Sequence, residues 1–309
     1  MATKNAITGT TQAVDRCRRL FLKTSALMGL ALASPVLAFD LNELLQGGGD
    51  SENGGKTGEL LKGAGKILSS QKEMDFQSEF ALGQSLALEG FRRYGLPLKN
   101  KSLQKYINLV GNTVARHSNR PGIPYFFVVV DSPLHNAFAC PGGIIFISAA
   151  LVELMEDEAE LAAVLAHEVA HVGHRHALKS LRRAHLLEGV GQITAATMQG
   201  EDAEKVRQMV GGLQTILFDK GLDKNMEYEA DASSVATTYR TGYDPRGMQR
   251  VLRKLEREQE GAAKAGSWFS THPPLASRIE KAKDQRDKYR DDAGSAVVKT
   301  RFQRYKKYL

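Results

Sequence analysis

Two histidines and a glutamate stand at a spacing that suits hydrolysis by a metal ion. The pentapeptide His167-Glu168-Val169-Ala170-His171 closes a helix-forming run at residues 157–165. Because residues four apart share one face of an α-helix, both imidazoles can bind one metal, with Glu168 beside them as general base for a metal-bound water. The pattern predicts a zinc hydrolase. Two surface histidines on an ordinary helix are the alternative.

The start of this helix is also visible in the sequence. Asp157 is followed three residues later by Glu160 and then by the apolar residues Leu161, Val164 and Leu165. This order is a capping-box start to an amphipathic helix. The motif is therefore predicted to lie on a helix, as the chemistry requires.

Catalytic zinc usually takes three protein ligands, so a third donor must come from elsewhere in the chain. The metzincin spacing fails, because His174 and Ala177 stand where that pattern needs glycine and histidine. A second acidic helix offers Glu227 as the ligand, with Asp231 four residues on to accept the free N–H of a ligand imidazole. Glu229 is expected to point elsewhere. A solvated acidic helix face is the alternative.

Four motifs follow one another between about residues 73 and 283: residues 136–143, 160–171, 227–231, and 271–274 with Arg278 and Ile279. Together they resemble the gluzincin-type zinc metallopeptidases, the family of the HtpX-like, CAAX prenyl endopeptidase and periplasmic BepA-like proteases. The resemblance implies that His167, His171 and Glu227 bind one Zn²⁺ per subunit and that Glu168 is the general base. Cys140 departs from the family, whose members more often carry a small or aliphatic residue there.

Two late residues have candidate roles beside the metal. His272 is predicted to donate to the developing oxyanion, since Pro273 and Pro274 hold its loop extended. It can instead occupy the open zinc position, or be a surface histidine. Arg278 can orient that loop, bind a substrate carboxylate, or lie on a helix surface.

A protease must also hold its substrate extended, which an exposed sheet edge does through backbone hydrogen bonds. Residues 125–131 and 144–147 are predicted strands, with Pro141-Gly142-Gly143 as the turn before the second. Asn136, Ala137, Phe138 and Ala139 would meet the substrate backbone, which predicts broad sequence tolerance. The expected fold is α+β and mainly helical, a zincin-like catalytic domain with a small β-sheet edge beside the HExxH helix.

The 309 residues divide by composition. Residues 1–38 resemble a twin-arginine signal peptide, with Arg18 and Arg19 before an apolar stretch, and predict export to the periplasm. An uncleaved anchor or an unrelated arginine pair are the alternatives. Residues 39–72 read as a flexible leader, 73–283 as the zinc metallopeptidase domain, and 284–309 as a basic C-terminal tail.

Charge argues against nucleic acid as a partner. The net charge of +7 is made of +4 in residues 1–38, +6 in residues 281–309 and −3 between them. The tail, with Phe302, Tyr305 and Tyr308 among basic residues, is expected to be solvated, with peripheral contact to an anionic membrane as the alternative. Cys140, the last cysteine, is expected to be a small buried hydrophobe. Residues 190–198 and 206–218 are expected to be amphipathic helices over the active site rather than membrane spans.

These features predict a zinc-dependent endopeptidase. The resemblance implies that its substrates are misfolded or misassembled cell-envelope proteins and that it works beside envelope assembly machinery. Since twin-arginine substrates cross the membrane folded, the site is expected to be latent, covered by His272 or by residues 186–222. The alternatives are a zinc-bound periplasmic chaperone or assembly factor with a latent protease site, and a peptidase restricted to short peptides or chain ends.

Overall fold

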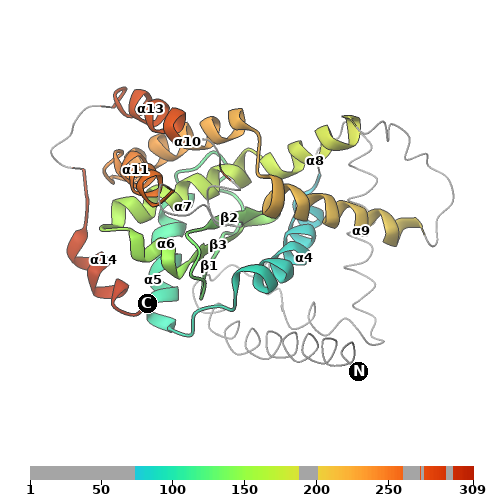
Figure 1. Cartoon of the computed structure of the whole chain (residues 1–309), viewed down its shortest axis with the longest axis horizontal. Coiled ribbons are helices and arrows are strands. Elements are labelled where there is room, and N and C mark those ends of the chain that lie inside the picture. The colour runs from blue at the N-terminus through green and yellow to red at the C-terminus, as the bar shows by residue number, and fades with distance from the viewer. Residues whose placement is uncertain (1–73, 188–200, 260–271, 273–274, 290–294) are drawn as a thin grey trace. The chain divides into compact units, whose positions relative to one another are not determined.

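The structure, a computed structural model, describes residues 74–187, 201–259, 272, 275–289 and 295–309 (Figure 1). The predicted signal peptide, the leader, residues 190–198 and the two prolines after His272 lie outside these ranges. The described elements are α4 (Phe76–Tyr94), α5 (Lys101–Ala115), β1 (Phe126–Val130), β2 (Ala137–Cys140), η1 (Pro141–Gly143), β3 (Ile144–Ser148), α6 (Ala149–Leu154), α7 (Glu158–Gly173), α8 (His176–Leu187), α9 (Glu201–Gln214), η2 (Thr215–Lys220), α10 (Lys224–Arg240), α11 (Gly247–Gln259), α13 (Leu275–Arg286) and α14 (Lys299–Lys306).

The strands form a small sheet in the order β1-β3-β2. β1 runs parallel to β3, and β2 runs antiparallel to it with Phe138 opposite Phe146. Both predicted strands are confirmed to within one residue at each end. The predicted turn is the short helix η1, where Gly142 and Gly143 have φ angles of 77° and 100° that L side chains rarely adopt.

Side chains alternate across this sheet, as strand geometry requires. Phe138 stacks on Phe146, whose ring also meets Phe91 of α4 edge-on. The intervening residues Ala137 and Ile145 belong instead to the main core with α5 and α7. The sheet therefore has α4 on one face and the helix that carries the HExxH motif on the other.

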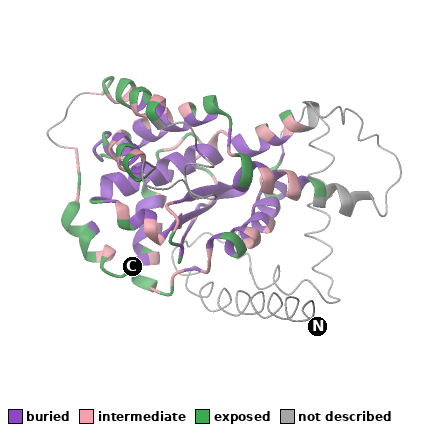
Figure 2. Cartoon of the chain, viewed as in Figure 1, coloured by how far each residue is buried: buried purple, intermediate pink, exposed green. Residues whose placement is uncertain are grey.

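Helix α7 is buried along almost its whole length, from Glu158 to Val172 (Figure 2). It packs against α5, α10, α11 and the sheet. The predicted start is confirmed, because the Asp157 side chain accepts a hydrogen bond from the Glu160 backbone N–H at 2.9 Å. The Glu160 side chain in turn accepts from the Glu156 N–H at 2.8 Å. A helix so enclosed is a rigid support for side chains that must keep their positions.

The C-terminal residues differ from the prediction of a solvated tail, which is wrong for α14. Phe302 is fully buried in the core that contains α5 and α7, and Tyr305 stacks on Tyr106 with ring centroids 4.2 Å apart. Arg301 pairs with the buried carboxylate of Glu158 at the start of α7. These contacts hold the short helix α14 against the core. Membrane contact by the remaining exposed side chains stays a prediction.

These elements confirm a mainly helical α+β fold with a small sheet beside the HExxH helix. Among the helices that the structure describes, no segment combines the length and the apolar character that crossing a bilayer needs. Helix α9 and the π-helical turn η2 together span the predicted segment 206–218 and extend beyond both of its ends, and Ile216 and Leu217 of η2 are buried.

Candidate metal centre

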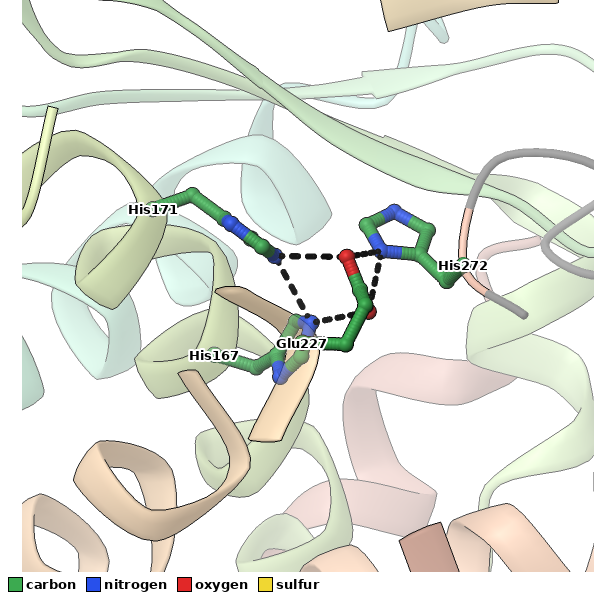
Figure 3. A group of neighbouring side chains, drawn as sticks. All are labelled: His167, His171, Glu227 and His272. Carbon is green, nitrogen blue, oxygen red and sulfur yellow. Dashed lines mark hydrogen bonds and ion pairs between the residues drawn. The ribbon is translucent and has the colours of Figure 1, made fainter. Parts of the chain in front are cut away.

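Four side chains from three parts of the chain converge at the centre of the domain (Figure 3). His167 and His171 come from α7, Glu227 from α10, and His272 from the segment before α13. One donor atom from each residue lies within 4.8 Å of every other, and all four residues are buried. The two residues that the sequence places 56 positions apart, His171 and Glu227, are therefore neighbours in space.

Distances within this cluster suit a zinc ion. The Nε2 atoms of His167 and His171 lie 2.9 Å apart, and each is 3.5 Å from a different carboxylate oxygen of Glu227. Zinc held tetrahedrally at about 2.0–2.1 Å separates its ligand atoms by ~3.3 Å, so the three donors need only small shifts to hold it. Two histidines and one glutamate are also the ligand set of thermolysin-type catalytic zinc sites.

Charge around the cluster favours a cation. Burial lowers the pKa of His167, but hydrogen bonds to Asp231 and Glu227 outweigh it and raise that pKa to about 9. Burial alone would raise the pKa of Glu227, but the nearby charges of His272 and Arg278 hold it well below its usual range. Metal binding to such a site would release the proton and pair the ionised carboxylate with the metal ion.

His167 is oriented from α10 and α13. Its Nδ1 lies 3.0 Å from the Asp231 carboxylate, which leaves Nε2 with its lone pair toward the cluster. Arg278 lies behind Asp231 with two hydrogen bonds of 2.7 Å. The same guanidinium donates to the backbone carbonyl of His272 at 2.9 Å and lies 3.0 Å from Glu227. Arg278 is fully buried, so its prediction as a helix-surface residue is wrong, and its contact with the His272 carbonyl agrees with the alternative that it orients that loop.

Glu168 lies beside the two candidate ligand histidines on α7. Its side chain is completely buried, and neither carboxylate oxygen has a hydrogen-bond partner among the residues that the structure describes. Burial raises the pKa of this carboxyl group. An unsatisfied buried carboxylate is costly to a fold and usually marks a site where another group binds. The arrangement provides a proton acceptor next to a metal site.

A pocket borders Glu168 and His171, and its other walls include Cys140 of β2 and Leu217 of η2. About 20 Å³ of this space admits a water-sized sphere. One water molecule needs about 10–15 Å³ on this measure. The pocket therefore has room for the attacking water.

His272 lies over the metal cluster rather than on the surface, so its interpretation as a surface histidine is wrong. Its Nδ1 is 2.9 Å from Glu227, and its Nε2 is 3.3 Å from the backbone carbonyl of Ala137 and 3.9 Å from Glu168. The ring thus stands between the cluster and strand β2. Both predicted roles beside the metal remain compatible with this position.

Strand β2 has one free edge, since it pairs only with β3 within the described sheet. Backbone groups on an antiparallel strand point alternately to the two sides. Asn136 directs its backbone N–H and C=O at Ser148, so Ala137 and Ala139 present theirs to the free edge. The contact of Ala137 with His272 agrees with this direction. Of the predicted edge residues, Asn136 and, by the same alternation, Phe138 therefore use their backbone groups within the sheet.

Sequence reasoning missed a second group of histidines beside the first. His176 Nδ1 lies 2.8 Å from His171 Nδ1, and its Nε2 is 3.1 Å from Glu229. His174 also contacts Glu229. The run of histidines after the HExxH motif was the available signal, and it was used only to reject the metzincin spacing. Cys140 is fully buried, as predicted, and burial raises the pKa of its thiol.

Comparison with known proteins agrees with this geometry. Residues 101–286, more than half of the chain, match peptidase family M48. Beta-barrel assembly-enhancing protease from Yersinia pestis is 32% identical over 232 residues, which cover 72% of this chain and 45% of the relative. Mitochondrial metalloendopeptidase OMA1 from Bos taurus is 28% identical over 230 residues, covering 71% of this chain and 44% of the relative. This chain thus spans less than half the length of these relatives. The predicted family resemblance is confirmed, and the chain belongs to peptidase family M48.

Proposed function

We propose that this protein is a zinc-dependent endopeptidase with one Zn²⁺ per subunit. His167, His171 and Glu227 are its ligands, and Glu168 is the general base. The observation that carries this proposal is the position of a buried, unsatisfied Glu168 carboxylate beside three convergent donors. A structural zinc site would have no use for such a carboxylate.

When bound, zinc lowers the pKa of water toward neutrality and polarises the substrate carbonyl. Glu168 accepts the proton from the attacking water and then returns it to the leaving amine. Its raised pKa suits both steps, because a carboxyl group with a pKa nearer neutrality both accepts and releases a proton readily. His272 Nε2, once released from Ala137, is placed to donate to the developing oxyanion.

Ala137 and Ala139 supply the edge on which the substrate lies. An extended peptide that pairs with the free side of β2 would run past Glu168 and the metal ligands. Main-chain pairing predicts tolerance of many sequences, with selectivity left to the apolar pocket that Phe138, Leu178 and Leu217 help to line.

The direct test compares the wild type with Glu168→Gln. Glutamine keeps the shape of the side chain but cannot accept the proton, so casein cleavage should fall by about 10²–10⁴-fold while bound zinc stays at one equivalent. Glu153→Gln, an exposed glutamate on α6, is the matched control and should cleave at the wild-type rate. Full cleavage by Glu168→Gln would refute the assignment of the base.

We also propose that the site is latent. Three features support this proposal. His272 adds a fourth donor to the cluster, and strand β2 is buried. Helix η2, part of the segment 186–222 that was predicted to cover the site, lines the small pocket beside Glu168. His272→Ala removes both the cover and the oxyanion donor, so casein cleavage by the purified protein should change: a rise shows that the cover limits the wild type, and a fall shows that the donor does. Latency is disproved if the wild type already cleaves unfolded casein at full rate and His272→Ala leaves that rate unchanged.

Substrates and location follow from the resemblance and from residues 1–38. We propose that the protein is exported to the periplasm by a twin-arginine-type signal, where it acts on misfolded or misassembled envelope proteins near the envelope assembly machinery. A relative named beta-barrel assembly-enhancing protease supports this setting. Replacing Arg18 and Arg19 together by lysine should leave the protein in the cytoplasm on cell fractionation. Unchanged periplasmic recovery would refute the export route.

A zinc-bound chaperone or assembly factor is the second candidate, and the small size of the pocket beside Glu168 is the observation that favours it. Complementation of a deletion strain separates the two. If Glu168→Gln fails to rescue the deletion phenotype, proteolysis is the function. Full rescue by that variant identifies binding instead.

A further inference from the structure

A chain of side chains leads from His171 to the surface of the domain. His171 Nδ1 lies 2.8 Å from His176 Nδ1, and His176 Nε2 lies 3.1 Å from Glu229. The second oxygen of Glu229 lies 3.1 Å from His174 Nδ1, and His174 Nε2 is 2.9 Å from the hydroxyl of Ser233. Helices α7, α8 and α10 and the junction between the first two all contribute to this chain of contacts.

The direction of these hydrogen bonds follows from the role of His171. If its Nε2 binds the metal, its single N–H is on Nδ1 and must donate to His176 Nδ1. A neutral His176 then carries its own proton on Nε2, which donates to Glu229. The His176 ring is fully buried, with Nδ1 against the His171 donor and Nε2 against the Glu229 carboxylate, so Nδ1 accepts and Nε2 donates. Each N–H along these contacts therefore has a single donor atom and a single acceptor.

We propose that His176, held in turn by Glu229, is a positioning residue that fixes the orientation and tautomer of His171 and so retains the zinc ion. The inference rests on the proposed role of His171 as a ligand. It assigns to this imidazole what the Asp231 carboxylate does for His167. The two ligand histidines are thus supported by different chemical groups.

The two supports also differ in their access to solvent. Asp231 is buried and paired with the buried Arg278, whereas the Glu229 side chain is 48% exposed. His176 itself is fully buried and lies between His171 and Glu229. A metal ligand on the HExxH helix is therefore connected to solvent through only two side chains, His176 and Glu229.

The same donors can be considered as a second metal site, because His174, His176 and Glu229 lie within 4.8 Å of one another. A metal on His176 Nε2 would displace the proton from that atom. His176 would then carry its proton on Nδ1, facing the Nδ1–H of His171 at 2.8 Å, unless one ring lost a proton entirely. His176 therefore cannot both support His171 and bind a second metal. The hydrogen-bonded arrangement is favoured because, unlike the second metal site, it does not require either ring to lose a proton.

The test measures zinc retention by the purified full-length protein, with transfer of zinc to a chromogenic chelator as the readout. His176→Leu removes the acceptor and should weaken zinc binding by about 10–100-fold. His176→Asn places an amide oxygen where Nδ1 was, so it should restore most of the retention. Glu229→Ala should weaken zinc binding in the same direction through loss of the partner of His176. Glu280→Ala, an exposed glutamate on α13, is its matched control.

The outcomes separate this inference from the proposed function. If His171→Ala loses its zinc but both His176→Leu and Glu229→Ala retain it like the wild type, the positioning role is overturned and the ligand set stands. If His171→Ala keeps one tightly bound zinc, the ligand set itself fails. Two equivalents in the wild type that fall to one in Glu229→Ala would show a second metal site and overturn the proposal. If His176→Leu does not fold, equal zinc retention by Glu229→Ala and the wild type is sufficient to refute the positioning role of His176.

Discussion

Replacement of Arg278 by methionine should destabilise the protein strongly. The guanidinium is fully buried and binds Asp231 through two hydrogen bonds of 2.7 Å, with further contacts to Glu227 and the carbonyl of His272. Methionine fills similar space but leaves the Asp231 carboxylate buried with its counter-charge removed. Glu227 loses a cation as well, although bound zinc still compensates that residue.

The magnitude follows from the cost of stranding a buried charge. Removing one partner of a buried ion pair lowers the free energy of unfolding by about 3–5 kcal/mol. With a urea m-value of about 2 kcal/mol/M, the unfolding midpoint should fall by about 2 M. Arg183→Met is the matched control, because Arg183 is exposed and 3.8 Å from Asp223, and its loss should cost under about 1 kcal/mol.

Urea unfolding followed by circular dichroism, with zinc in excess, measures both variants. Adding Asp231→Asn to Arg278→Met removes the stranded charge, so the double variant should be more stable than the sum of the two single effects predicts. A loss below about 1 kcal/mol in Arg278→Met, or strict additivity in the double variant, would refute the view that Arg278 compensates these carboxylates.

Two other predictions concern the metal and the start of α7. Chelation should lower the thermal midpoint of the wild type, since zinc at 1,000 times its Kd contributes about 4 kcal/mol, and His171→Ala should show no such response in differential scanning fluorimetry. Burial would raise the pKa of Glu158, but Arg301, Tyr243 and Tyr106 together lower it below the usual 4.5. Its ion pair therefore stabilises the fold above about pH 4.5 and is lost as the pH falls through the lowered value. Arg301→Gln should cost about 1–2 kcal/mol at pH 7, because Arg301 is half-exposed, and the deficit should close in urea titrations at progressively lower pH.

Local patterns predicted the parts of the site that lie within one helix. Asp157 and Glu160 mark the start of α7, and the spacing of His167 and His171 fixes their common face. The pairing of Glu227 with Asp231 at the same spacing indicated a ligand and its support on a second helix. Because these features depend on residues three or four apart, a single sequence contains them.

Features that depend on how helices meet were beyond the sequence. Arg175 adopts a left-handed conformation with φ of 55°, which ends α7 and starts α8 so that His176 turns back onto His171. Nothing in the residue types there indicates that bend. Arg278 stands in a polar helix, and its burial is stabilised by carboxylates that belong to α10. The packing of α14 through Phe302 was likewise hidden in a strongly basic segment.

The spacing on the two facing helices explains why the ligand histidines need different supports. His167 lies near both Glu227 and Asp231, so α10 supplies it with a co-ligand and with an acceptor for its N–H. His171 is one turn farther along α7 and reaches only Glu227, so its N–H needs an acceptor from another element. His176 occupies that position, and the pocket beside Glu168 is lined by His171 and not by His167. A bound metal would therefore be held by buried charges at His167, while the pocket and the solvent-linked support both lie at His171. Because of this asymmetry, substitutions at His176 should disturb zinc retention and substrate turnover together, whereas those at Asp231 should also disturb folding.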